Sequence, residues 1–219
     1  MVCTGEGHDM KPIISDKKIE IAEKRVMELI DLGDIKKLSE QTKDNIAQFY
    51  ESKSRNRLET ATLIYSYSSN SKKEQGVEVS ANYADYGEVV AASYYAMYYI
   101  VHAYLSKKYS MKLREDIRGV HAITYSLIIY YLVKTNNLAT HLYEEYLQTM
   151  KTTAEIHNIS IEDFKEQACG YANKYDESRT AREMFTYYVT KSAEEHHAQH
   201  ALNIAQEFIG VVRELMMKK

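Results

Sequence analysis

The chain has 219 residues and a formal net charge of -3, so bulk positive charge cannot drive nucleic-acid binding, which would need a local basic patch. Its 2 cysteines, Cys3 and Cys169, exclude a disulfide framework and a thiolate metal cluster, and they favour a cytoplasmic location. With 1 proline and 8 glycines, the chain lacks the turn residues that many short strands need, which favours an all-α fold.

Apolar residues recur at helical spacing along most of the chain. The expected helices cover residues 15–32, 42–67, 83–107, 121–134, 138–151, 160–174, 177–190 and 191–217. Between them we expect a turn-like piece at 35–41, a polar loop at 68–80 and a charged linker at 109–119. We predict an antiparallel helical bundle over residues 41–219, preceded by an extension, residues 1–40, made of a tail and one extra N-terminal helix.

The longest uncharged run, Val89 to Leu105, is shorter than the ~20 residues that span a bilayer, and it contains several tyrosines, a serine and a histidine. We therefore expect a helix buried by protein and no membrane partner. Tyrosines in such a helix pack in a core or a dimer interface, and the alternative is that they stack on nucleobases.

A basic segment between the two most apolar helices is the first candidate site. It holds Lys107, Lys108, Lys112, Arg114 and Arg118, and His121 follows it. Arginine can hold a phosphate bidentately and histidine can move a proton near neutral pH, so this pairing suits a metal-independent phosphoester site. The alternative is a solvated basic surface, with His121 as a partly buried residue at the start of a helix.

A second candidate lies in the last helix, where His196 and His200 are four residues apart and share one face. This spacing can hold a metal, but a third ligand is needed and none is evident nearby. The alternative is a solvent-facing polar surface. His197 falls on the apolar stripe, and we expect it to be packed in the core. Cys169 is expected to be a buried apolar residue, and the sequence indicates no cofactor.

The run from Ser93 to Lys108, SYYAMYYIVHAYLSKK, resembles the helix RAYYAMFHAARALL of HEPN domains, which are helical bundles of prokaryotic defence and toxin–antitoxin systems. The segment RGVHAITYSL resembles the His-containing start of the next helix in that family. Near the end of the chain, five residues match the closing pattern of the family: Arg182, Tyr187, Ala201, Ala205 and Phe208. The resemblance covers about residues 42–217.

This resemblance implies a homodimeric, metal-independent endoribonuclease or toxin component. By resemblance, His121 is the general acid and base acting on a ribose 2′-hydroxyl, and Arg114 binds the scissile phosphate, with Arg118 as its substitute. The residues implied to contact RNA are Lys107, Lys108, Lys112 and Tyr125. The implied partners are a second copy of the chain, RNA and a nucleotidyltransferase-type antitoxin.

Two departures from the family pattern support an alternative function. Glu115 follows the arginine where family members carry Asn, Asp or His, and Tyr125 lies further from His121 than the tyrosine of the paired toxins. The alternative is a non-catalytic module that binds a nucleotide or a nucleotidyltransferase near the same basic segment. A purely structural homodimer is a third hypothesis.

Overall fold

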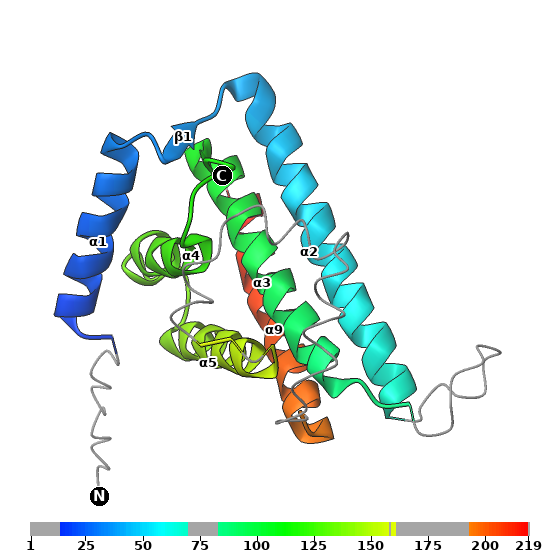
Figure 1. The fold of residues 1–219 in the computed structure, drawn as a ribbon. Coiled ribbons are helices and arrows are strands. Elements are labelled where there is room, and N and C mark those ends of the chain that lie inside the picture. The colour runs from blue at the N-terminus through cyan, green and yellow to red at the C-terminus, as the bar shows by residue number, and fades with distance from the viewer. Residues whose placement is uncertain (1–13, 70–82, 158, 161–192, 219) are drawn as a thin grey trace, which may run out of the picture.

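The computed structural model describes residues 14–69, 83–157, 159–160 and 193–218, and the described chain is mainly helical (Figure 1). Its elements are α1 (Asp16–Asp31), β1 (Ile35–Lys37), α2 (Glu40–Ser68), α3 (Tyr86–Tyr109), β2 (Met111–Leu113), α4 (Val120–Ile128), the π-helical segment η1 (Ile129–Val133), α5 (Thr140–Ile156) and α9 (Glu195–Met217). The predicted all-α class is confirmed apart from one small sheet. Within the described part of the chain, every helix is too short or too polar to cross a bilayer.

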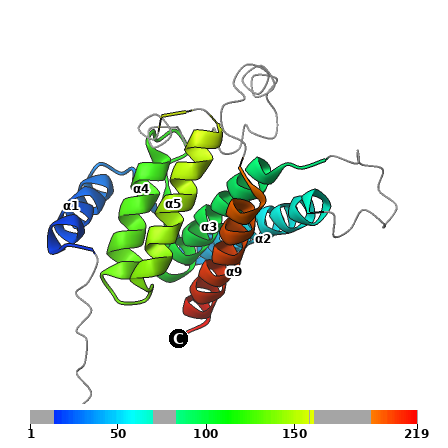
Figure 2. The same ribbon diagram turned by 90° about the horizontal axis from the view of Figure 1, so that it is seen from below.

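Helix α3 lies at the centre of the fold, and every side chain from Val89 to Ser106 is buried. The Asp85 side chain begins the helix by accepting a hydrogen bond from the Glu88 N–H, and Ser110 ends it in the left-handed conformation. Helices α2, α9 and α5 pack around α3 (Figures 1 and 2). The uncharged run is therefore a core helix surrounded by protein, as expected.

The helices around α3 differ in direction. Ser54 Oγ donates to Ala96 O at 2.7 Å and the Asp85 N–H donates to Ser68 Oγ at 2.9 Å, so α2 runs antiparallel to α3. Lys108 at the end of α3 donates to the carbonyl of Lys218 just after α9, so these two helices run in the same direction. The expected antiparallel arrangement thus holds for α2 and α3 and is wrong for α3 and α9, because the starts of these two helices also pack together, with Val89 and Ala198 in one buried cluster.

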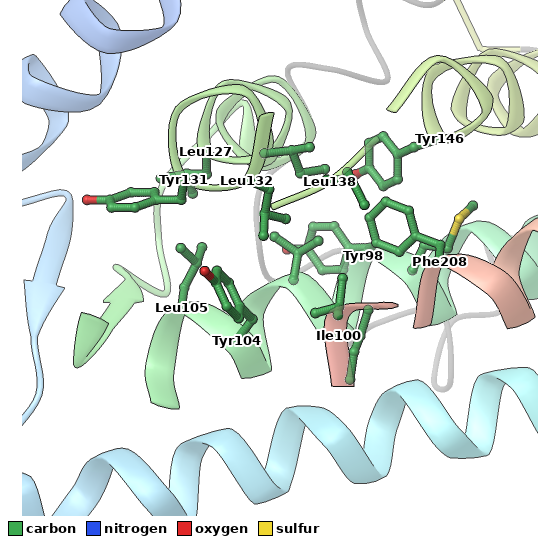
Figure 3. Close-up of a cluster of buried hydrophobic side chains, with 14 of the residues drawn as sticks. Tyr98, Ile100, Tyr104, Leu105, Leu127, Tyr131, Leu132, Leu138, Tyr146 and Phe208 are labelled. Atoms are coloured by element: carbon green, nitrogen blue, oxygen red, sulfur yellow. The ribbon is translucent and has the colours of Figure 1, made fainter. Parts of the chain in front are cut away.

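The main core lies where α3 meets α4, η1, α5 and α9, and it is rich in tyrosine (Figure 3). Tyr146 of α5 stacks on Phe208 of α9, with ring centroids 5.8 Å apart. Helix α1 adds Ala22, Val26 and Leu29 to this same core and packs against α4 and η1. The N-terminal helix therefore packs on the bundle.

The small sheet was not expected from the sequence. Strands β1 and β2 pair antiparallel, with Ile35 opposite Leu113 and Lys36 opposite Lys112. We expected a turn-like piece at the first strand and a charged linker at the second. Each strand has only three residues, and its partner lies far away in the sequence, which local periodicity cannot indicate.

Several predictions concern residues outside the described part of the chain. They are the helices at 160–174 and 177–190, most of the loop at 68–80, the burial of Cys169, and the family-pattern residues Arg182 and Tyr187.

Candidate functional site

The predicted basic segment lies around β2, at the end of the bundle where α3 terminates (Figure 1). Lys107 and Arg118 are exposed, whereas Lys108 binds the carbonyl of Lys218. Lys112 Nζ lies 3.2 Å from a carboxylate oxygen of Glu115. These cations lie on β2 and in the segments that flank it, and carboxylates offset part of their charge.

Arg114 is engaged by two carboxylates. Its Nη1 lies 3.0 Å from Asp34 Oδ1 and its Nε donates to Asp116 Oδ1 at 2.6 Å. The Arg114 N–H also donates to the carbonyl of Asp34 at 2.8 Å. A backbone hydrogen bond and Arg114 lower the pKa of the Asp116 carboxyl. Arg114 therefore joins the turn before β1 to the end of β2, and a phosphate would have to compete with both carboxylates.

His121 is buried in the core and is only 1% exposed. Its Nδ1 lies 2.7 Å from the hydroxyl of Tyr94, and its ring packs 5.3 Å from the ring of Tyr98. Burial, with a smaller contribution from nearby His102, lowers the pKa of His121 to about 3. The imidazole is therefore neutral and closed to solvent at physiological pH. This geometry does not support the catalytic role expected of it and agrees with the alternative of a buried residue at a helix start.

A buried polar network includes His121. Tyr146 donates to the Tyr94 hydroxyl at 3.4 Å, which links α5 to α3. His102 Nε2 lies 3.0 Å from Thr124 Oγ1, and burial lowers the pKa of His102 to about 3. A cavity of about 10 Å³, lined by His102 and Lys112 among others, separates this network from the sheet. It has room for no more than about one water molecule, so RNA cannot reach these histidines there.

Tyr125 is half-buried and faces α5. Its ring centroid lies 5.4 Å from that of Tyr143. Burial raises the pKa of the Tyr143 hydroxyl well above its usual value. Tyr125 therefore packs between helices, and it is not part of the lysine cluster around the sheet.

The sequence analysis missed two lysines that join this cluster. Lys36 and Lys37 are exposed on β1, and Lys36 lies directly opposite Lys112. Residues opposite one another in an antiparallel pair share a face, with Cα atoms about 4.5–5.5 Å apart. We call Lys36, Lys37 and Lys112 the basic ribbon. Like charges directly opposite in a sheet are destabilising, so a bound anion would stabilise this pair.

A cleft of about 360 Å³ lies between α5 and α9. Its polar lining includes Glu145, Thr149, Glu194, His197 and His200. His200 Nε2 lies 2.8 Å from Glu145 Oε2, which joins the two helices. The expected pairing of His196 with His200 is not what the structure favours, because His200 is paired across the cleft.

The first turn of α9 also corrects one prediction. His196 Nδ1 lies 3.3 Å from Glu194 Oε2, and the His196 and His197 ring centroids are 3.9 Å apart. His197 is exposed, so the expectation of a packed core histidine is wrong. The helix begins only at Glu195, and the apolar stripe reaches the core from Ala198 onward. Glu194, His196 and His197 offer ligand atoms that all lie within 4.8 Å of one another.

Comparison with known proteins adds no relative to these observations: no family model, curated protein or solved structure matches the chain.

Proposed function

We propose that this chain is a HEPN-like helical bundle that acts as a non-catalytic module and binds RNA through its basic ribbon. The observation that carries the proposal is the Lys36–Lys112 pair, because two lysines from distant segments lie opposite each other on one small sheet. Exposed Lys107 and Arg118 lie in the segments that flank β2. The burial of His121 supports binding without cleavage, since a general acid and base must reach the ribose.

The test compares RNA binding by two charge-matched double variants. Lys36→Gln/Lys112→Gln removes the facing pair, and Lys17→Gln/Lys151→Gln removes two exposed lysines from α1 and α5. Fluorescence anisotropy with a labelled single-stranded RNA, measured over a salt series, is expected to show weaker binding by the ribbon variant. If both lysines contact phosphates, the plot of log affinity against log salt concentration becomes less steep in the ribbon variant, by about 1.4 in the magnitude of its slope. Equal weakening by the two variants would reject the ribbon as the RNA site.

Incubation of the same RNA in EDTA tests for catalysis. The RNA is expected to stay intact, because His121 is neutral and buried. Cleavage by the wild type that is lost in Arg114→Gln but kept in Arg25→Gln would overturn the non-catalytic proposal and favour the endoribonuclease. Arg25 is a suitable control, because it is exposed on α1 and its ion pair with Glu28 is long, at 3.9 Å.

A homodimer and a nucleotidyltransferase-type partner are also part of the proposal. Helix α2 packs against α3 and carries two exposed apolar side chains, Phe49 and Leu63. Their exposed fractions are 49% and 53%. Contiguous exposed apolar surface marks interaction sites, and in this proposal the two side chains belong to the dimer contact. Light scattering of the wild type and of Phe49→Ser/Leu63→Ser tests the dimer, and a monomeric wild type at micromolar concentration would reject it.

A further inference from the structure

We propose that Glu194, His196 and His197, at the start of α9, bind a divalent transition-metal ion, with zinc as the probe. Their ligand atoms all lie within 4.8 Å of one another, and all three side chains are exposed. Imidazole nitrogen with carboxylate oxygen is a donor set that suits zinc. The inference is independent of the proposed RNA binding, because the basic ribbon lies on β1 and β2.

The distance between two of these atoms agrees with a zinc site. In a tetrahedral site with bonds of about 2.0–2.1 Å, neighbouring ligand atoms lie about 3.4 Å apart. The separation of His196 Nδ1 and Glu194 Oε2 is 3.3 Å. A metal ion therefore fits between these two atoms with little side-chain movement. The ring of His197 lies beside that of His196, with ring centroids 3.9 Å apart.

A capping box positions two of the three ligands, Glu194 and His197. The Glu194 carboxylate accepts from the His197 N–H, and His197 Nδ1 accepts from the Glu194 N–H at 3.4 Å. The two residues are thus positioned by the first turn of the helix, and the ordering cost of metal binding is reduced.

The local charge favours a cation despite the position at a helix start. The N-terminal end of a helix disfavours a cation only weakly at an exposed site. The carboxylate of Glu194 would be a ligand, and Glu145 lines the same cleft as Glu194 and His197. Three protein ligands leave a fourth position for water or for an oxygen of an anionic ligand that enters the cleft.

His200 is not expected to be a ligand. Its Nε2 is held 2.8 Å from Glu145 Oε2, on the other side of the cleft. This distinguishes the proposed trio from a site built on the four-residue spacing of His196 and His200, and the two sites predict different effects of substitution.

The experiment titrates the full, tag-free, chelator-treated chain with zinc chloride in a calorimeter. One zinc per chain is expected, with binding at least about tenfold weaker in His196→Ala and in His197→Ala. His200→Ala and His141→Ala are expected to bind zinc like the wild type. His141 is the matched control, because it is exposed and lies 3.3 Å from Glu207. Among the described residues, this histidine–glutamate pair has no third metal-ligating side chain close by.

Cobalt substitution gives a second readout that does not depend on heat. The wild type with Co²⁺ is expected to develop visible absorption bands of a tetrahedral ion, and His196→Ala/His197→Ala is expected not to. Circular dichroism checks that the variants are folded, which exposed positions should allow. No zinc binding by the wild type, or equal binding by the wild type and the double variant, would reject the site. Loss in His200→Ala with retention in His197→Ala would replace the trio by the His196–His200 pair and overturn the proposal.

Discussion

The hydroxyl of Tyr94 lies 2.7 Å from Nδ1 of His121, and both side chains are buried. This contact joins the centre of α3 to the first turn of α4. Gly119 precedes that turn with a φ of 72°, a left-handed conformation that suits glycine. The family resemblance implied that His121 is catalytic. In the structure, His121 instead provides a hydrogen-bond partner for the buried hydroxyl of Tyr94.

We predict that Tyr94→Phe lowers the free energy of unfolding by about 1–3 kcal/mol. The substitution keeps the ring but leaves His121 Nδ1 and the Tyr146 hydroxyl without the partner that the Tyr94 oxygen provides. Urea denaturation followed by circular dichroism measures the loss. Tyr130→Phe is the matched control, because Tyr130 is half-buried; its expected change is below about 0.5 kcal/mol. Equal losses in the two variants would mean that the buried contact adds no stability.

Stability is predicted to fall as the pH drops below about 6.5. Burial lowers the pKa of both His102 and His121 to about 3, and that of His157 to about 4. Between these values and the unfolded pKa of about 6.5, the unfolded chain binds protons that the folded chain does not. The stabilisation is therefore complete above about pH 6.5 and is lost progressively toward pH 3. The upper limit is about 1.4 kcal/mol per pH unit for each histidine.

Urea titrations at about pH 7.5, 6 and 5 measure this slope, because these conditions span the range in which an unfolded histidine titrates. His102→Gln/His121→Gln is expected to have a shallower slope, and the exposed control His141→Gln is expected to keep that of the wild type. A wild-type stability that is constant from neutral pH to about pH 5 would contradict the burial of neutral histidines.

We predict that Arg114 makes a small contribution to the stability of the fold through its two ion pairs. Its guanidinium is 41% exposed and binds Asp34 and Asp116, so Arg114→Gln should cost about 1 kcal/mol or less, since solvent screens the ion pairs. Asp34→Asn should give a similar loss, because it removes the other half of the same contact. A double-mutant cycle measured by urea denaturation checks this. Additive single losses would show that the pair is not coupled.

The helices could be predicted from the sequence because their signal is local. For α3, the helical spacing of apolar residues and the two lysines near the end of the run, Lys107 and Lys108, predicted the bounds to within a few residues. The burial of His121 also had a local signal, because it begins a strongly apolar run. The family resemblance indicated a catalytic histidine instead, and the local signal agrees better with the structure.

The basic ribbon and the surface position of His197 could not be predicted in the same way. Lys36 and Lys112 are far apart in sequence, and their pairing depends on where the fold places the helices that precede the two strands. His197 continues the apolar stripe of α9 toward the N-terminus of the helix. The helix begins at Glu195, and its first turn lies beyond the core, so His197 is exposed. Both properties depend on tertiary structure.

The packing of α2 on α3 leads to a final prediction. Ala61 is fully buried and packs with Val89 and Leu202, so there is no room for a larger side chain. Ala61→Leu should lower the free energy of unfolding by about 1–3 kcal/mol, because α2 must move away from α3. Glu59→Leu adds the same side chain at an exposed position of α2 and should change stability by less than about 0.5 kcal/mol. Urea denaturation measures both, and an Ala61→Leu variant as stable as Glu59→Leu would show that the two helices are less closely packed than the structure indicates.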